Sequence, residues 1–297
     1  MTQDYNIYKN KWIALLLLLP TILILLLFLY YPILETFLLS LYRVGFLGLT
    51  KKFVGLDNYK YIFSSKDYIK IFKNTAVFIV PSILLSITIG FIISLFLNSK
   101  IKGISFFRLL LIWPYALPPA VAGVIFLFLF NEQSGITNFL LNKVLQIQIP
   151  WLSNNILAMG VLIIAFVWKM LGYNIVFYLA ALQNIPEELL EAASLEGASY
   201  FQKIFKIILP LLSPISLFLL ITNTIAAFFE SFAFVDLITK GGPAGSTTIL
   251  IYSIYRDGFE YFKTGIAAAQ SVILFIFVVI LTLIQLRVSS RMVHYER

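Results

Sequence analysis

The sequence predicts an all-α integral membrane protein with six transmembrane helices. Of the 297 residues, 60% are hydrophobic and only 12% are charged, which is about half the charged share of an ordinary soluble domain. Apolar runs of about 20 residues, the length that crosses about 30 Å of hydrocarbon as a helix, occur six times along the chain. The segments between them are too short to hold a separate soluble domain. We therefore expect residues 1–297 to form a single transmembrane domain.

The six predicted spans follow one another with short polar or turn-rich connections. The first has Lys9 and Lys11 ahead of a leucine-rich core, as a secretory signal does. It is longer than a signal core, and no small-residue cleavage site follows, so we expect a retained helix. The predicted spans are residues 12–31, 76–97, 109–130, 156–182, 211–229 and 266–286.

Several classes of site are missing from the sequence. The chain has no cysteine, and its one histidine, His294, lies in the C-terminal tail, so neither a disulfide nor a metal site is expected. There is no phosphate-binding loop, no G-x-S-x-G or H-E-x-x-H motif, and no basic stripe with interleaved aromatics. We expect no catalytic residue, no cofactor and no nucleic-acid partner, although an intramembrane enzyme or a receptor stays open as a minor alternative.

The net charge of +8 bears on topology. Lysines and arginines divide almost evenly between the segments on the two sides of the six predicted spans. Charge counting alone therefore does not orient the chain.

Residues 184–210 form a polar, charged segment between two of the most apolar runs. Pro186 and the two glutamates after it are typical of a helix start, and Gly197 supplies the left-handed conformation that ends a helix. Ser199 and Gln202 have the spacing of a capping box for a second helix. The segment is predicted to be a helix-turn-helix beside the membrane.

The same segment contains the pattern E-A-A, three residues, G, nine residues, I-x-L-P. This pattern resembles the EAA loop of the membrane subunits of bacterial ABC importers, which also lies between the fourth and fifth spans. The resemblance implies that residues 184–210 are a cytoplasmic coupling loop that docks in a cleft of an ATPase subunit. It further implies the bacterial inner (cytoplasmic) membrane, with both termini cytoplasmic. The alternative is a polar linker that happens to match. The matching residues are Glu191, Ala192, Ala193, Gly197, Ile207, Leu209 and Pro210.

Further stretches resemble the carbohydrate-type permeases of that family, and more specifically the A-type permeases of sn-glycerol-3-phosphate importers. The resemblance implies a second permease subunit, two ATP-binding subunits and a periplasmic substrate-binding protein. It implies sn-glycerol-3-phosphate or glycerophosphodiesters as cargo, with a neutral sugar or oligosaccharide as the alternative. It also places the loop 230–265 toward the binding protein, although an interfacial lid fits the same residues. The stretches are FVGLDNY, LIWPYALPPAVAGVIFLFLFN, VWKMLGYNIVFYLAALQNIP, GGPAGSTT, IYSIYRDGFE and AAAQSVIL.

Polar residues inside the predicted spans are candidates for a substrate pathway. Lys169 lies in the middle of the fourth span, where a charge costs at least about 2.5 kcal/mol. It is a candidate contact for an anionic cargo, although it could instead pair with a structural acid such as Glu230 or with helix carbonyls. Glu230 follows the fifth span and could be an interfacial charge, and the buried amides could be interhelical glue. The candidates are Lys169, Tyr173, Asn174, Asn223, Glu230 and Gln270.

Overall fold

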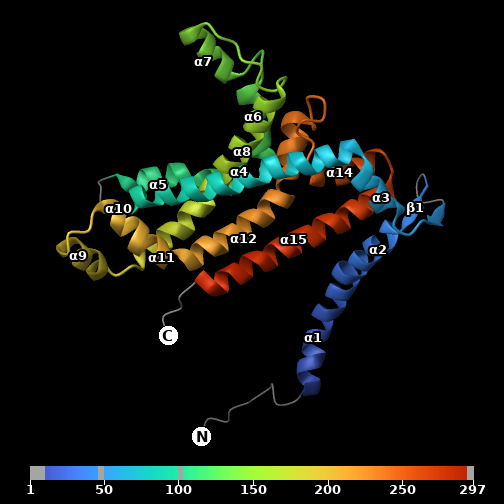
Figure 1. Cartoon of the computed structure of the whole chain (residues 1–297), viewed down its shortest axis with the longest axis horizontal. Coiled ribbons are helices and arrows are strands. Elements are labelled where there is room, and N and C mark those ends of the chain that lie inside the picture. The colour runs from blue at the N-terminus through green and yellow to red at the C-terminus, as the bar shows by residue number, and fades with distance from the viewer. Residues whose placement is uncertain (1–10, 46–49, 100–102, 293–297) are drawn as a thin grey trace. The chain divides into compact units, whose positions relative to one another are not determined.

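The computed structural model describes residues 11–45, 50–99 and 103–292 (Figure 1). Its contacts divide the chain into two compact units, which are described separately. The first contains residues 1–64 and 254–273, and the second contains residues 65–253 and 274–297. His294 lies outside the described residues. Within the described residues, four helices are long and apolar enough to cross a membrane, and two bent pairs raise the number to six if each pair is one span.

The first unit begins with a long helical segment. The helix α1 (Lys11–Leu25) continues through a π-helical turn, η2 (Leu26–Tyr30), into α2 (Tyr31–Ser40). The first span is therefore longer than the predicted range of 12–31. Its apolar side chains stay exposed within the chain, as expected of a helix that faces lipid or another subunit.

A small polar cap follows this span. The strands β1 (Tyr42–Val44) and β2 (Lys51–Phe53) pair in antiparallel register, and α3 (Asp57–Ser64) comes next. The buried amide of Asn58 donates hydrogen bonds to the carbonyl oxygens of Ser40 (2.8 Å) and Tyr42 (3.0 Å). These bonds satisfy backbone groups at the end of α2, so they fix α3 against the helix terminus.

Three long helices make the centre of the second unit: α4 (Lys66–Leu97), α8 (Asn155–Gln183) and α12 (Ser213–Phe229). One face of α4 carries a buried stripe of small residues at four-residue spacing, Ser82, Ser86, Gly90 and Ser94. A Cβ at Gly90 would lie 2.6 Å from the Cβ of Asn174 on α8. The small residues therefore let α4 and α8 pack closely, as in many membrane helix pairs.

The third predicted span is not one straight helix. The helix α5 (Ile104–Ile112) leads into a 3-10 turn, η4 (Trp113–Ala116), and α6 (Pro119–Phe130) leaves at 105°. Pro118 and Pro119 lack the amide hydrogens that would continue the helical ladder, which explains the break. The prediction of an unbroken span over 109–130 was therefore wrong.

The fifth span is preceded by a sharp bend. The coupling segment comprises α9 (Glu187–Leu195), α10 (Tyr200–Lys203), a π-helical turn η5 (Ile204–Ile208) and α11 (Leu209–Leu211), and it meets α12 at a bend of 68°. Beyond Phe229 the helical backbone resumes at once as α13 (Ser231–Phe234) and η6 (Val235–Thr239). The helix α12 ends at Phe229, as predicted, and Glu230 lies at its junction with α13.

The remaining elements are α7 and three helical segments toward the C-terminus. The helix α7 (Ile136–Leu145) precedes α8, whereas α9 follows the opposite end of α8 (Figure 1). Toward the C-terminus lie α14 (Leu250–Tyr255), the π-helical turn η7 (Arg256–Glu260) and α15 (Thr264–Met292). The amide of Gln285 on α15 donates to the Thr224 hydroxyl on α12 over 2.9 Å, which ties the last helix to the second unit.

Candidate functional site

The predicted helix-turn-helix at residues 184–210 is present. Gly197 has a φ of +82°, the left-handed conformation that ends α9. Ser199 accepts a hydrogen bond from the Gln202 amide (3.3 Å), and the Gln202 side chain accepts one from the Ser199 amide (2.7 Å). This is the predicted capping box. Lys203 of α10 also joins the two helices, because its ammonium donates a hydrogen bond to the Ser194 hydroxyl on α9 over 3.0 Å.

The two halves of this segment differ in how they are held. Ile204, Ile208 and Leu212 are buried in one cluster with Tyr178 of α8 and Leu219 of α12. Every residue of α9, by contrast, is exposed or half-buried. The second half is thus anchored to the membrane helices, whereas the first half projects from them.

Both halves expose apolar side chains among the described residues. Leu195 of α9 is 90% exposed, and Phe201 of α10 and Phe205 of η5 are also exposed. The motif residues Glu191 and Ala192 lie on the same helix as Leu195 and are exposed too. An exposed apolar surface is typical of a protein or membrane contact, and its part in coupling stays a prediction. Of the other motif residues, Ala193 lies on α9, Gly197 is in the turn, Ile207 is in η5, and Leu209 and Pro210 are in α11.

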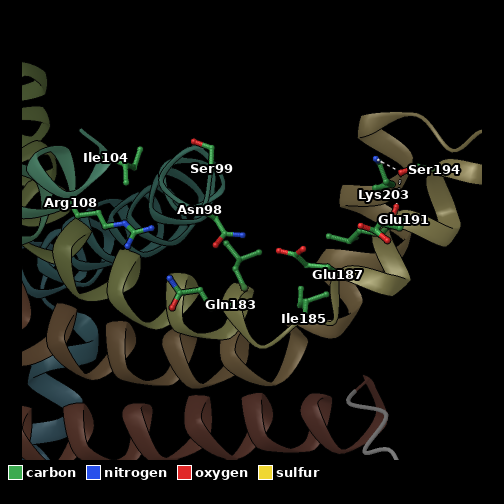
Figure 2. Close-up of a pocket in the computed structure, with 12 residues that line it drawn as sticks. Asn98, Ser99, Ile104, Arg108, Gln183, Ile185, Glu187, Glu191, Ser194 and Lys203 are labelled. Carbon is green, nitrogen blue, oxygen red and sulfur yellow. Dashed lines mark hydrogen bonds between the residues drawn. The ribbon is translucent and has the colours of Figure 1, made fainter. Parts of the chain in front are cut away.

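A pocket of about 620 Å³ lies between this segment and the ends of α4, α5 and α8 (Figure 2). Its lining includes Arg108 of α5 together with Glu187, Glu191 and Lys203 of the coupling segment. Arg108 also donates to the Leu97 carbonyl over 2.8 Å, which satisfies the end of α4. The pocket therefore presents both signs of charge beside the exposed motif residues.

A second group of candidate residues lies on one seam between α8 and α12. The antiparallel helices are joined by three polar contacts in succession. The Tyr178 hydroxyl donates to Ser216 over 3.1 Å. Asn174 meets Asn223, and Lys169 meets Glu230 with 3.2 Å between Nζ and Oε2. Glu230 is therefore level with the middle of α8 and pairs with Lys169, as one of the alternatives from the sequence had it.

The two asparagines form a closed amide pair. Asn174 Nδ2 donates to Asn223 Oδ1 over 3.2 Å, and Asn223 Nδ2 donates back to Asn174 Oδ1 over 2.7 Å. Asn223 Oδ1 also accepts from Ser86 of α4 over 3.0 Å. All three side chains are buried, so in this chain they hold α4, α8 and α12 together. Their part in a substrate pathway stays a prediction.

Lys169 has an aromatic environment. Its side chain is 5% exposed, and its ammonium lies 5.1 Å from the centre of the Tyr115 ring. Tyr173 packs on the same ring at 5.1 Å between centroids. Gly172 permits this approach, because a Cβ there would lie 2.9 Å from the Tyr115 Cβ. Tyr115 was missed from the sequence, although the W-P-Y-A-L-P-P break that positions it was a visible signal.

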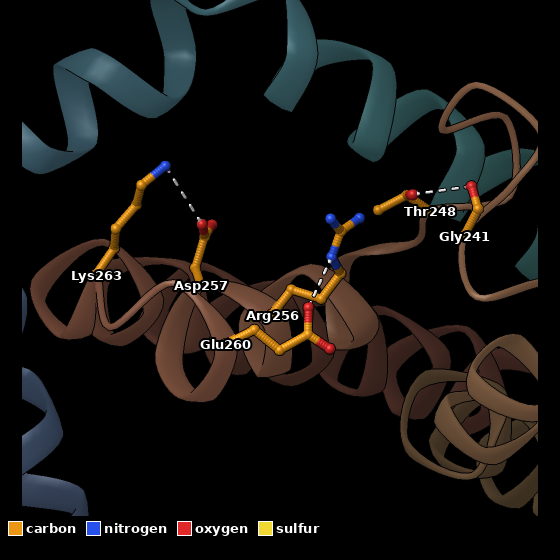
Figure 3. A network of polar contacts seen from close by, with 6 residues as sticks. All are labelled: Gly241, Thr248, Arg256, Asp257, Glu260 and Lys263. Carbon is orange, nitrogen blue, oxygen red and sulfur yellow. Dashed lines mark hydrogen bonds and ion pairs between the residues drawn. The ribbon is translucent and has the colours of Figure 1, made fainter.

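The predicted loop 230–265 is divided between the two units and is held by hydrogen bonds within each. In the second unit, Lys70 donates to the Ala244 carbonyl over 2.7 Å. Thr248 donates to the Gly241 carbonyl over 3.1 Å (Figure 3). In the first unit, Asp257 lies 3.9 Å from Lys263 and accepts from Gln270 over 2.6 Å. Gln270 is thus buried and hydrogen-bonded inside the first unit.

The segment between α6 and α8 contains one carboxylate, Glu132, whose pKa is shifted. Glu132 Oε1 accepts from the backbone amides of Ser153 (2.7 Å) and Leu152 (3.1 Å). Hydrogen bonding to Ser153, through its side chain first and its amide second, holds the pKa of Glu132 below its ordinary value of 4.5. The charged form of Glu132 therefore stabilises the backbone turn that leads into α8.

Residues 86–294 match the family of binding-protein-dependent transport system inner membrane components. The chain belongs to this family. It is 38% identical over 97% of its length to the sn-glycerol-3-phosphate transport system permease protein UgpA of Agrobacterium fabrum (strain C58), of which 98% is covered. It is also 38% identical to the protein of the same name from Escherichia coli (strain UTI89), with both chains covered in full.

Solved structures show the same fold. A chain of a bacterial ABC transporter involved in the import of the acidic polysaccharide alginate superposes with a TM-score of 0.83 at 23% identity, covering 96% of this chain and 98% of that chain. A chain of the bacterial alginate ABC transporter in complex with an alginate pentasaccharide-bound periplasmic protein gives 0.85 at 22% identity, covering 99% and 100%. The chain is therefore a multi-pass inner membrane component of a transport system, and its resemblance to ABC importer permeases is confirmed.

Proposed function

We propose that this chain is the permease subunit of a binding-protein-dependent ABC importer for sn-glycerol-3-phosphate or glycerophosphodiesters. The observation that carries the proposal is full-length similarity, at 38%, to relatives named as sn-glycerol-3-phosphate permeases. The partners are a second permease subunit, two ATP-binding subunits and a periplasmic substrate-binding protein. The chain forms part of the transport pathway and has no ATPase site of its own, since its sequence has no phosphate-binding loop.

The coupling surface is residues 184–210, which dock in a cleft of the ATPase subunit. Support comes from the contrast within the segment: α9 projects with exposed apolar residues, whereas Ile204 and Ile208 are buried against α8 and α12. A displacement of α9 by the ATPase partner is thereby passed to the two helices that carry the Lys169–Glu230 pair. Glu191, Ala192 and Leu195 make the contact, and Gly197 sets the angle between the two halves.

We assign the coupling surface and both termini to the cytoplasm, and the whole chain to a single permease domain. Because the sequence has no cysteine, one introduced cysteine reports accessibility without background. In the chain expressed without its ATPase partner, Leu195→Cys should react with a membrane-impermeant maleimide only in inside-out vesicles. Val144→Cys, on α7 at the other end of α8, should react only in intact spheroplasts. The reverse pattern would overturn the orientation.

Uptake into proteoliposomes tests the cargo. The complex assembled with its binding protein and ATPase subunits should accumulate labelled sn-glycerol-3-phosphate only when ATP is enclosed with the ATPase subunits. Glycerol is the matched neutral control and should show no ATP-dependent uptake. ATP-driven uptake of a neutral oligosaccharide, with no uptake of the phosphate ester, would show that the chain serves a sugar importer instead.

A further inference from the structure

The Lys169–Glu230 pair is an asymmetric ion pair in the middle of the membrane helices. The Lys169 side chain is 5% exposed and is enclosed by α8, α12 and the Tyr115 ring, whereas 41% of the Glu230 side chain is exposed. Glu230 also lies at the junction of α12 and α13, where the regular helix is interrupted. The cation is therefore fixed, and the carboxylate has room to move.

The contact between Lys169 and Glu230 is suited to exchange of the anion rather than to a permanent ion pair. Glu230 Oε2 is shielded from solvent, yet among the described residues no side chain or amide donates it a well-aligned hydrogen bond, and its polar neighbour is the Lys169 ammonium at 3.2 Å. A buried ion pair built for stability gains from further hydrogen bonds to both partners. This pair has an aromatic face on the cation and an accessible side on the anion.

We propose that Glu230 is a resident counter-anion that the phosphate of the cargo replaces on Lys169 during translocation. This proposal rests on the proposed function and identifies the specificity-determining contact. A phosphate monoester carries about −1.5 to −2 charges near pH 7, so it repels Glu230 and attracts Lys169. The carboxylate turns toward its exposed side as the ester takes its place, and it returns when the cargo leaves. The ammonium is paired at each stage.

The same arrangement discriminates against neutral cargo. A polyol without charge gains too little to displace a carboxylate from a buried ammonium. Free phosphate in solution is also a poor competitor, because Glu230 is tethered and has a high effective concentration at the site. Cargo handed over by a docked binding protein has a comparable local concentration, so exchange occurs when delivery occurs.

Thermal unfolding of the assembled complex tests the anion site without transport. Glu230→Gln leaves Lys169 without its anion, and inorganic phosphate in the millimolar range should then raise the melting temperature of the complex by several degrees. The wild-type complex and the Lys169→Met/Glu230→Gln complex should show no such shift. Absence of a phosphate shift in Glu230→Gln would overturn the proposal.

Uptake of labelled sn-glycerol-3-phosphate, normalised to assembled complex, completes the test. Lys169→Met alone leaves the shielded Glu230 Oε2 without its cation and is expected to lower assembly, so the neutral pair Lys169→Met/Glu230→Gln is the informative variant. It should assemble but lose at least tenfold in uptake, while Lys143→Met, an exposed lysine on α7, should leave uptake unchanged. Wild-type uptake by the neutral pair would reduce Lys169 and Glu230 to a structural role. If the wild-type complex takes up no sn-glycerol-3-phosphate, the proposed function fails, and the phosphate shift still decides the anion site.

Discussion

The coupling surface and the α8–α12 seam are opposite in construction. The coupling surface is built from residues within about two dozen positions of one another, and several of its apolar side chains, such as Leu195, Phe201 and Phe205, are exposed. The seam joins residues 38 to 61 positions apart, such as Tyr178 with Ser216 and Lys169 with Glu230, and its polar side chains are buried. We propose that the first region meets another protein, whereas the second satisfies polar groups between helices.

This difference assigns separate tasks to the two regions. Exposed apolar groups on a locally stabilised scaffold suit a contact that forms and breaks with the ATPase partner. A buried charge in a span is rarely idle and suits contact with a charged cargo. Variants that affect one task and leave the other intact are therefore the most informative.

The largest effect is expected at Gly197. Valine cannot adopt a φ of +82° without a cost of about 1–3 kcal/mol, so Gly197→Val should change the angle between α9 and α10. ATP hydrolysis stimulated by the loaded binding protein should fall to the unstimulated level in the reconstituted complex, while the amount of inserted chain is unchanged. Gly197→Asn is the matched control, because asparagine tolerates the left-handed conformation. Full stimulation in the valine variant would remove the turn from coupling.

A smaller effect is expected at Leu195, where only one contact is lost. If the side chain is buried by the ATPase subunit, its loss removes about 1.5–3 kcal/mol, or at least about tenfold in affinity. Leu195→Asp should weaken binding of the ATPase subunit to the detergent-solubilised permease by that factor. Val144→Asp, at a position 76% exposed on α7, is the control. Equal losses in both variants would mean that Leu195 has no specific contact.

The amide pair should affect stability more than coupling. Asn174→Leu leaves the buried Asn223 with unsatisfied groups, at a cost of about 1–3 kcal/mol. The melting temperature of the solubilised complex should fall, and Asn174→Leu/Asn223→Leu should recover part of the loss. An unchanged melting temperature in the single variant would show that the pair does not hold the seam.

The smallest effect concerns Glu132, which belongs to neither region. Its pKa is lowered in the folded state, so its contribution is present above the ordinary pKa of 4.5 and is lost as pH falls through the folded value. Backbone protection factors of Leu152 and Ser153 should therefore drop as pH falls below about 4.5. Glu132→Gln should show protection that does not change with pH over this range, whereas a wild-type pH response in that variant would assign the effect to another group.

The sequence predicted the coupling surface better than the seam for a physical reason. A cap, a left-handed glycine and an initial proline act over a few residues, so Pro186, Gly197 and Ser199 were enough to predict the turn and both helix starts. Pairing of Lys169 with Glu230 remained one alternative among several in the sequence. Only the antiparallel register of α8 and α12, which the sequence does not give, brings the two side chains together.

The third span was predicted as unbroken for a local reason. Pro118 and Pro119 were visible, but the apolar run continued on both sides, so hydropathy concealed the break between α5 and α6.

The most direct test of separate tasks compares Gly197→Val with Lys169→Met/Glu230→Gln in one assay that records ATP hydrolysis and sn-glycerol-3-phosphate uptake together. The account predicts that Gly197→Val loses stimulated hydrolysis and uptake alike. The neutral pair should keep stimulated hydrolysis and lose uptake, because ATP-driven movement continues without a cation for the phosphate. Loss of stimulated hydrolysis in the neutral pair, or uptake at the wild-type rate, would contradict the division between the two regions.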